Sequence, residues 1–211
     1  TSLSDIKNVL GIDKYLHQEG LAHRFMPVEA VGYYKDAGGV YVDGSYELLM
    51  ADDIRWGNLN DPDVAIDPES RRSVLYVKQA YMRLARVLLS KGDKEAAVAV
   101  LDKCIEFFPN DKDPYDILML SYPEIYYRAG ATEKGDEFMK TLLENSTDNL
   151  RYYYDLDPQF ILYYTDGIYE NMAIMDNMID IATRFKRNEL RTQITKALNE
   201  ENSKFYPYLV R

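Results

Sequence analysis

The sequence predicts a mainly α-helical protein, in which antiparallel helix pairs stack into an α-α superhelix behind a small irregular part with a short β-hairpin. Two observations carry this prediction. Apolar residues recur at spacings of three and four through most of residues 68–211, which is the period of a half-buried helix. Asp-Pro dipeptides, which suit an N-cap followed by the first helical position, also recur there. They are Asp67-Pro68, Asp113-Pro114 and Asp157-Pro158.

Residues 78–110 have the spacing of a helix–turn–helix unit of about 34 residues. In such a unit a small side chain lets two helix backbones approach, and a large one fills the gap beside it. The packing and turn positions are Tyr81, Leu84, Ala85, Gly92, Ala97, Leu101, Cys104 and Pro109. This stretch resembles one tetratricopeptide repeat. The resemblance implies an interaction scaffold and no catalytic role for this part.

The first 67 residues are predicted to form an irregular α+β cap, because they are rich in glycine, proline and aspartate. A helical pattern runs over residues 5–18. Short alternating stretches at residues 21–26 and 40–42 predict two strands. We expect them to pair as a hairpin that leans on helices, since two short strands alone are marginal. Ser45 is the predicted N-cap of a helix that follows.

Residues 68–110 form the first predicted repeat. Asp67 is expected to cap a helix that runs to about residue 90, with one apolar stripe along it. Asp93 is expected to cap the return helix, which ends before Pro109.

Residues 111–146 are predicted as a second, degenerate repeat. Asp113 is expected to open its first helix, which ends at Gly130, and Thr132 to cap its second. Pro123 falls inside the first of these helices and is expected to kink it. The second repeat is therefore less regular than the first.

Two pairs of positions relate the predicted repeats. Gly92 and Gly130 are expected to make equivalent turns, and Ala97 and Gly135 to be equivalent small packing positions. Residues 147–211 lack the repeat signature, and we predict that they cap the array. They contain a long apolar-periodic element over residues 158–185 with a predicted break at residues 166–167, and a final helix over residues 189–204.

Composition excludes several classes of partner. The formal net charge of -10 argues against nucleic acid and against anionic membrane surfaces, which need clustered Lys and Arg. The hydrophobic content of 46% is that of a globular protein, and no apolar run is long enough to cross a bilayer. Because the chain begins at Thr1 without a methionine, we expect a processed chain or an excised segment.

The sequence assigns no catalytic residue, cofactor or metal. Cys104 is the only cysteine and stands at a small packing position, where a thiol acts as a small hydrophobe. His17 and His23 have no metal-ligand spacing, and no nucleophile elbow or phosphate-binding glycine loop is present. The acidic loop lacks the order of a calcium-binding loop. Its carboxylates are Asp61, Asp63, Asp67 and Glu69.

Tyrosine is the compositional exception, with 19 residues. Adjacent tyrosines on a helix point about 100° apart, so one ring of a pair can be buried while the other lines a surface. Such rings suit peptide or sugar recognition. The alternative is that they fill wide gaps between helices, and both interpretations stay open. The clusters are Tyr33-Tyr34, Tyr126-Tyr127, Tyr152-Tyr153-Tyr154 and Tyr163-Tyr164.

A wider resemblance rests on the order of several stretches. Residues 20–27 (Gly-Leu-Ala-His-Arg-Phe-Met-Pro) are similar to Gly-Leu-Ala-Tyr-Arg-Leu-x-Pro, with a departure at His23. Residues 46–58 and then 72–85 follow in matching order. Together they resemble the soluble C-terminal region of a bacterial family of multi-spanning inner-membrane proteins. The N-terminal half of that family looks like a protein O-mannosyltransferase.

This resemblance implies a fragment on the periplasmic face of the inner membrane, with the membrane-embedded catalytic part upstream. It transfers no catalytic residue to this chain. The polar and aromatic residues in the shared stretches, such as Arg24, Trp56 and Asn58, have a structural explanation as a turn packed beneath the first repeat.

Three functions follow from these patterns. The first is a non-catalytic interaction domain that binds an unknown protein or peptide. The second is a free-standing carbohydrate-active enzyme with paired carboxylates. The third is a structural spacer whose groove is blocked by its own side chains. For the first, we predict a groove on the inner face of the first helix of each repeat, lined by Gln79, Arg83, Tyr122 and Tyr126.

Overall fold

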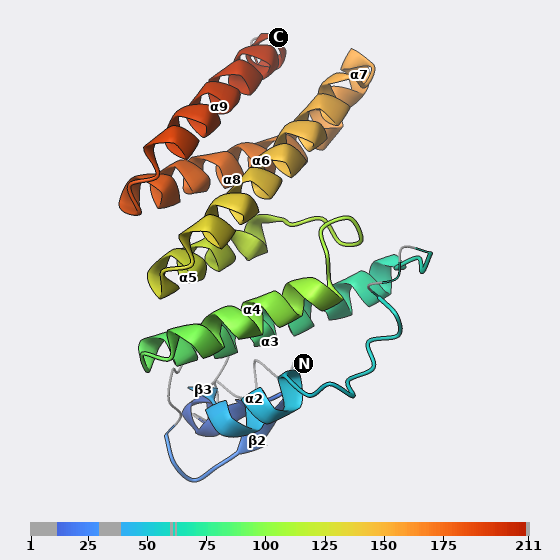
Figure 1. The fold of residues 1–211 in the computed structure, drawn as a ribbon. Helices are drawn as coiled ribbons and strands as arrows, with labels where there is room; N and C mark the ends of the chain where they lie inside the picture. Colours follow the sequence, from blue (N-terminus) through green and yellow to red (C-terminus); the bar gives the residue numbers. More distant parts are fainter. Residues whose placement is uncertain (1–11, 30–38, 60, 62, 210–211) are drawn as a thin grey trace. The chain divides into compact units, whose positions relative to one another are not determined.

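The computed structural model describes residues 12–29, 39–59, 61 and 63–209 of the 211-residue chain. The fold is mainly α with one small sheet, as the sequence predicts (Figure 1). The chain divides into an N-terminal unit, Thr1–Asp113, and a C-terminal unit, Pro114–Arg211. Throughout the described ranges, each helix is too short or too polar to cross a membrane.

The N-terminal unit begins with a three-stranded sheet in the order β2-β1-β3. A 3-10 turn, η1 (Asp13–Tyr15), leads into β1 (Leu16–Glu19). β1 pairs antiparallel with β2 (Ala22–Phe25) and parallel with β3 (Gly39–Val40).

β2 lies within the strand predicted at residues 21–26, whereas β3 shares only Val40 with the strand predicted at 40–42, and the two strands do not pair with each other. Both pair with β1, which lies where the sequence predicted the end of a helix over residues 5–18. Residues 5–11 of that prediction lie outside the described residues. Gly20 explains the error, since a glycine after a short apolar segment marks either a helix end or a hairpin turn. Here Gly20 has φ +61° and makes the turn between β1 and β2.

Helix α2 (Val42–Leu49) begins three residues before the predicted N-cap, so the prediction for Ser45 was wrong. The Ser45 hydroxyl is buried within α2, where it donates to the Gln18 carbonyl at 2.8 Å and accepts from the Gly20 N–H at 3.3 Å. It satisfies backbone groups of the hairpin instead of those at a helix end. α2 ends at Leu49, before Trp56. The Trp56 ring packs edge-on against the Phe108 ring, with centroids 5.6 Å apart.

The first predicted repeat forms the helical hairpin of α3 (Pro68–Ser90) and α4 (Lys94–Phe107). Asp67 caps α3 as predicted, accepting from the N–H groups of Glu69 and Ser70 at 3.0 and 3.1 Å. Asp93 caps α4 by accepting from the Ala96 N–H. The side chains at six packing positions are fully buried; these are Tyr81, Leu84, Ala85, Ala97, Leu101 and Cys104.

The C-terminal unit begins differently from the prediction. The first helix does not open at Asp113: a 3-10 turn, η2 (Ile117–Leu120), capped by Asp116, precedes α5 (Ser121–Ala129). Pro123 is therefore the third residue of α5 and not an interior one. Its missing N–H falls in the first turn, where no helical acceptor is lost, so it does not act as the predicted kink.

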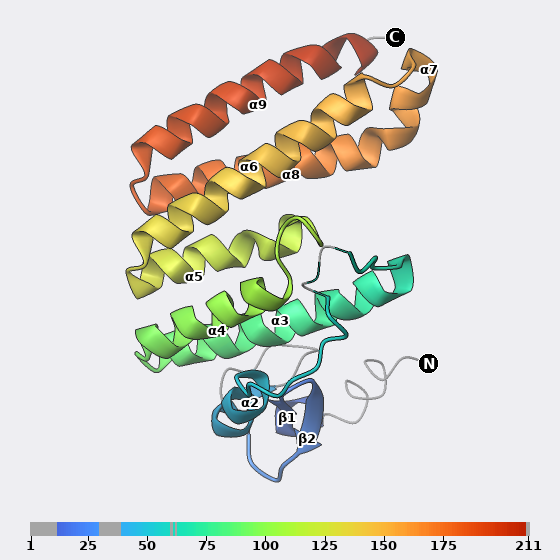
Figure 2. The same cartoon turned by 45° about the vertical axis from the view of Figure 1, so that its right-hand side comes forward.

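α6 (Thr132–Tyr154) follows α5. The predicted cap at Thr132 was wrong, because Thr132 is already the first helical residue and Ala131 occupies the N-cap position without a side-chain hydrogen bond. Asp157 caps α7 (Pro158–Ile161) as predicted, by accepting from the Gln159 N–H at 3.1 Å. η3 (Leu162–Tyr164) then leads to α8 (Thr165–Arg184), so the break lies before residues 166–167 and not at them. α9 (Asn188–Leu209) ends the unit, and α6, α8 and α9 pack side by side (Figure 2).

Three helix–helix turns share one geometry. Each has a left-handed residue after the first helix: Gly92 (φ +89°), Gly130 (φ +92°) and Lys186 (φ +57°). In each, the next N–H donates to the carbonyl five residues back, which is the bond of a Schellman motif. The bonds are Asp93 to Leu88 (3.0 Å), Ala131 to Tyr126 (2.9 Å) and Arg187 to Ala182 (2.7 Å). The α8–α9 hairpin therefore has the same turn as the α3–α4 and α5–α6 hairpins, without their glycine.

Candidate interaction surface

The described residues contain no group of three His, Cys, Asp or Glu side chains placed to hold a metal ion. Cys104 is a buried free thiol. His17 is buried, with Nε2 2.9 Å from the Val28 carbonyl oxygen, so its role in this unit is structural.

The four predicted groove residues have different surroundings. Gln79 and Arg83 lie half-buried on α3, and the Arg83 guanidinium donates to the Gly39 carbonyl at 3.2 Å. Tyr122 and Tyr126 are buried in the C-terminal unit, with ring centroids 5.4 and 6.4 Å from that of Phe138. That a ligand contacts these residues stays a prediction.

Side chains of α3 hold the sheet and α2 in the N-terminal unit. Besides the Arg83 bond, the Tyr81 hydroxyl donates to the Leu49 carbonyl at 2.7 Å. The Gln18 amide donates to the Ala80 carbonyl at 3.0 Å. Burial raises the pKa of Tyr81 above its ordinary value, so the hydroxyl stays protonated and able to donate. Tyr81, Arg83 and the Ala80 carbonyl of α3 are therefore already bonded to the chain's own N-terminal part.

A buried ion pair closes the N-terminal unit. Lys78 on α3 is 5% exposed, and its Nζ lies 2.5 Å from Oδ2 of Asp113. Arg71 Nε approaches the other carboxylate oxygen at 3.4 Å. Asp113 thus completes the first repeat instead of capping the next helix. The sequence has no local signal for this pairing, because the partners stand 35 residues apart.

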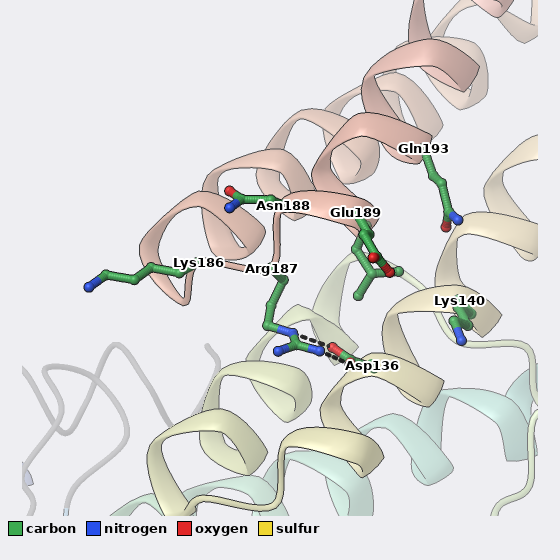
Figure 3. Close-up of a pocket in the computed structure, with 8 residues that line it drawn as sticks. Asp136, Lys140, Lys186, Arg187, Asn188, Glu189 and Gln193 are labelled. Carbon is green, nitrogen blue, oxygen red and sulfur yellow. Dashed lines mark hydrogen bonds and ion pairs between the residues drawn. The ribbon is translucent and has the colours of Figure 1, made fainter.

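A polar pocket of about 390 Å³ lies in the C-terminal unit between α6 and the α8–α9 turn (Figure 3). Arg187 binds both carboxylate oxygens of Asp136, with Nε 2.8 Å from Oδ1. The Tyr127 hydroxyl donates to the same Oδ1 at 2.9 Å. The hydrogen bond to Asp136 raises the pKa of Arg187. Figure 3 shows Lys186 pointing away from this pair. Because Asp136 lies on α6 and Arg187 in the α8–α9 turn, their ion pair joins two helical hairpins.

Exposed aromatic and leucine side chains gather where α6, α7, η3 and α8 meet. Six of the twelve large hydrophobic side chains that are exposed among the described residues lie within residues 152–169. Tyr163 is the most exposed of them, at 82%. Such concentrations on a protein surface mark interaction sites. We call this surface the aromatic corner; it consists of Tyr152, Phe160, Leu162, Tyr163, Tyr164 and Tyr169.

The aromatic corner rests on a fixed base of stacked rings. Tyr153 stacks on Tyr164 with centroids 5.5 Å apart, and Tyr152 meets Tyr153 edge-on at 5.7 Å. Gly167 on α8 makes room for this row, because a Cβ there would lie 2.6 Å from the Tyr153 hydroxyl oxygen. Tyr169 packs edge-on against the buried Phe205 of α9 at 5.6 Å. The exposed rings of Tyr152, Tyr164 and Tyr169 are therefore each in contact with another ring of α6 or α9.

Comparison with known proteins confirms the repeat predicted from the sequence. Residues 78–111 match the tetratricopeptide repeat model. The chain matches no curated protein and no solved structure. A tetratricopeptide repeat is in general a non-catalytic unit that binds proteins or peptides, so the match and the helical fold together indicate a protein-interaction domain.

Proposed function

We propose that this chain is a non-catalytic interaction domain that binds a protein or peptide through the aromatic corner. The observation that carries the proposal is the exposure of Tyr163 and its neighbours beside the stacked rings of Tyr153 and Tyr164. Tyrosine is favoured at interfaces because its ring contributes a large contact area and its hydroxyl a hydrogen bond. Rings that are already ordered lose little conformational freedom on binding.

The corner is a better candidate than the predicted groove because its side chains are accessible. Tyr122 and Tyr126 are 1% exposed, and Arg83 is bonded within its own unit. A partner would have to displace these contacts, whereas Tyr163 needs no rearrangement. Packing and recognition are thus divided among the tyrosine clusters, with residues 152–169 as the recognition part.

We also propose that the domain is the periplasmic C-terminal part of a membrane glycosyltransferase-like protein. The support is the resemblance carried by residues 20–27 and 46–58. The complete reading frame of the gene tests this proposal. A series of apolar spans upstream of Thr1 is expected, and a start codon directly before Thr1 would overturn it.

Site-specific photo-crosslinking tests the interaction surface. A photoreactive phenylalanine analogue at position 163 is expected to give discrete crosslinked proteins in the cells of origin. Tyr76 is the matched control, because it is also a highly exposed tyrosine (71%) and lies on α3, outside the corner. Crosslinks at position 163 should disappear when Tyr152 and Tyr164 are changed to alanine. The same crosslinked proteins at positions 163 and 76 would contradict the proposal.

A further inference from the structure

We infer that the aromatic corner takes a cationic segment of its partner, one that carries arginine or lysine side chains. The inference rests on the proposed function and specifies its ligand. Three observations carry it: the charge of the segment, the placement of its carboxylates beside the rings, and the pairing of the nearby basic side chains.

The charge of the corner is strongly negative. Residues 148–170 contain five acidic side chains and one basic side chain, Arg151, so the formal charge is -5 + 1 = -4. Asp148 pairs with Arg151 at 3.2 Å. Among the described residues no ion pair involves the other four carboxylates, and all four are exposed; they are Asp155, Asp157, Asp166 and Glu170. Asp157 also caps α7, a role that leaves its negative charge in place.

The carboxylates flank the exposed rings. On α8, Asp166 stands three residues before Tyr169 and four before Glu170, so these side chains share one face of the helix. Tyr153 lies against Gly167 on the first turn of the same helix. Burial first, and then the Glu170 carboxylate, raise the pKa of Tyr153, which agrees with a carboxylate close to the ring row.

Basic side chains on neighbouring elements do not cancel this charge. α9 packs beside the corner through the contact between Tyr169 and Phe205, and Lys204 is its nearby cation. Lys204 Nζ lies 2.7 Å from an oxygen of Glu201, which is itself 3% exposed. The pair is neutral as a whole, so among the described residues the four exposed carboxylates dominate the charge beside the rings.

Rings and carboxylates together select a cation. A guanidinium or ammonium group over a tyrosine ring is attracted by the ring's quadrupole, and a flat guanidinium also stacks on it. The carboxylates add an attraction that salt screens. The same charges repel nucleic acid, acidic peptides and anionic lipid surfaces. A neutral sugar would use the rings alone, and we therefore expect it to bind more weakly.

A defined peptide panel tests the inference on the purified chain. The probe is a fluorescein-labelled peptide of about 15 residues with arginine at every third position between glycine and serine. Its matched control carries citrulline, which keeps the shape of arginine and removes its charge. Fluorescence anisotropy should show the arginine peptide binding about tenfold tighter than the citrulline peptide, and weakening about fivefold between ~50 and ~500 mM NaCl, since the attraction is screened.

Variants locate the binding. Asp166→Asn with Glu170→Gln should weaken the arginine peptide about fivefold and leave the citrulline peptide unchanged. The charge-matched control is Asp176→Asn with Glu144→Gln, two exposed carboxylates elsewhere on α8 and α6, which should change neither. Tyr163→Ala should weaken both peptides. Circular dichroism melts confirm that each variant is folded.

Four results would overturn the inference. Equal affinity for arginine and citrulline peptides, both lost in Tyr163→Ala, would refute the cationic ligand and leave the proposed interaction surface standing. Binding of a neutral oligosaccharide such as maltohexaose at Tyr163, without peptide binding, would make the corner a sugar site. Equal losses in the acidic pair and its control would place the attraction elsewhere, and no peptide binding at all would refute the cationic ligand.

Discussion

A Cβ atom on Gly135 would lie 2.5 Å from Cε1 of Tyr127, so the tyrosine ring of α5 rests directly on the backbone of α6. In the first repeat the equivalent position holds Ala97, which is fully buried. The residue equivalent to Tyr127, 38 positions earlier, is Leu89. The larger ring in the α5–α6 hairpin requires the smaller residue opposite. The same ring then reaches Asp136 and, through it, Arg187.

Gly135→Ala is therefore expected to destabilise the C-terminal unit by about 1 kcal/mol, because the overpacking itself costs about 2 kcal/mol. Alanine's better helix propensity, worth about 1 kcal/mol, offsets only part of this cost. Urea unfolding followed by circular dichroism measures the difference. Adding Tyr127→Leu to Gly135→Ala should recover stability relative to the single variant. An alanine variant as stable as the parent would show that the ring does not rest on this glycine.

Lys186→Gly is expected to stabilise the C-terminal unit by about 0.5–1 kcal/mol. Lys186 has φ +57°, a conformation that costs an L-residue roughly 1–2 kcal/mol and glycine nothing. Glycine's greater freedom in the unfolded chain takes back part of that gain. Gly130→Ala is the reverse control, because no atom lies within 4 Å of its added Cβ and only backbone strain acts. The melting temperature should rise in Lys186→Gly and fall in Gly130→Ala, relative to the parent. Loss of stability in Lys186→Gly would mean that the turns are not equivalent.

Lys78→Met is expected to cost the N-terminal unit about 3 kcal/mol, because it leaves the Asp113 carboxylate buried without its main partner. The double variant Lys78→Met with Asp113→Leu should recover a large part of the loss, since no uncompensated charge is left. Denaturant unfolding of the single and double variants gives both numbers. A Lys78→Met variant within about 0.5 kcal/mol of the parent would rule out a structural role for the pair.

The cap of α3 makes stability depend on pH. The hydrogen bond from the Ser70 hydroxyl, and then that from the Ser70 N–H, hold the pKa of Asp67 below its ordinary value of 3.8. Because the folded-state pKa is depressed, the stabilisation is full above pH 3.8 and is lost as the pH falls through the folded value. The melting temperatures of the parent and Asp67→Ala should differ constantly between about pH 5 and 7 and converge in acid. A difference that persists at the lowest pH would exclude the charged cap.

Gly167→Ala should weaken binding at the aromatic corner without removing any aromatic residue. The added methyl group would displace the Tyr153 ring, on which Tyr164 stacks. The helix itself gains propensity, so we expect stability to change by less than about 1 kcal/mol. Anisotropy titration with the arginine peptide compares this variant with the parent. Unchanged affinity would show that the order of the ring row does not matter for binding.

Local sequence patterns correctly predicted three aspartate caps and two glycine turns. The carboxylate caps Asp67, Asp93 and Asp157 act as predicted, because a cap needs only the next few N–H groups. Gly92 and Gly130 make the predicted turns for the same reason. Asp113 is followed by proline as Asp67 and Asp157 are, yet it does not cap a helix. A buried lysine 35 residues away takes its carboxylate, and no local pattern indicates that.

Long-range packing also determines that residues 16–19 form a strand and which tyrosines are buried or exposed. Residues 16–19 form a strand because the turn at Gly20 folds onto Ser45, which lies on a later helix. The sequence identified the tyrosine clusters and left two roles open. Tyr122 and Tyr126 are buried against Phe138, whereas Tyr163 is exposed, and the difference depends on which helices pack beside each ring. The candidate site therefore became visible only with the arrangement of the helices.

The most direct test of the interaction surface is a nuclear magnetic resonance titration of the chain with ring-labelled tyrosine. The 19 tyrosines give probes in both units. With the arginine peptide added, the signals of Tyr152, Tyr163 and Tyr164 should shift and broaden first, while Tyr76 and the buried Tyr81 stay in place. Shifts centred on Tyr76, or the absence of any shift at residues 152–169, would contradict the account.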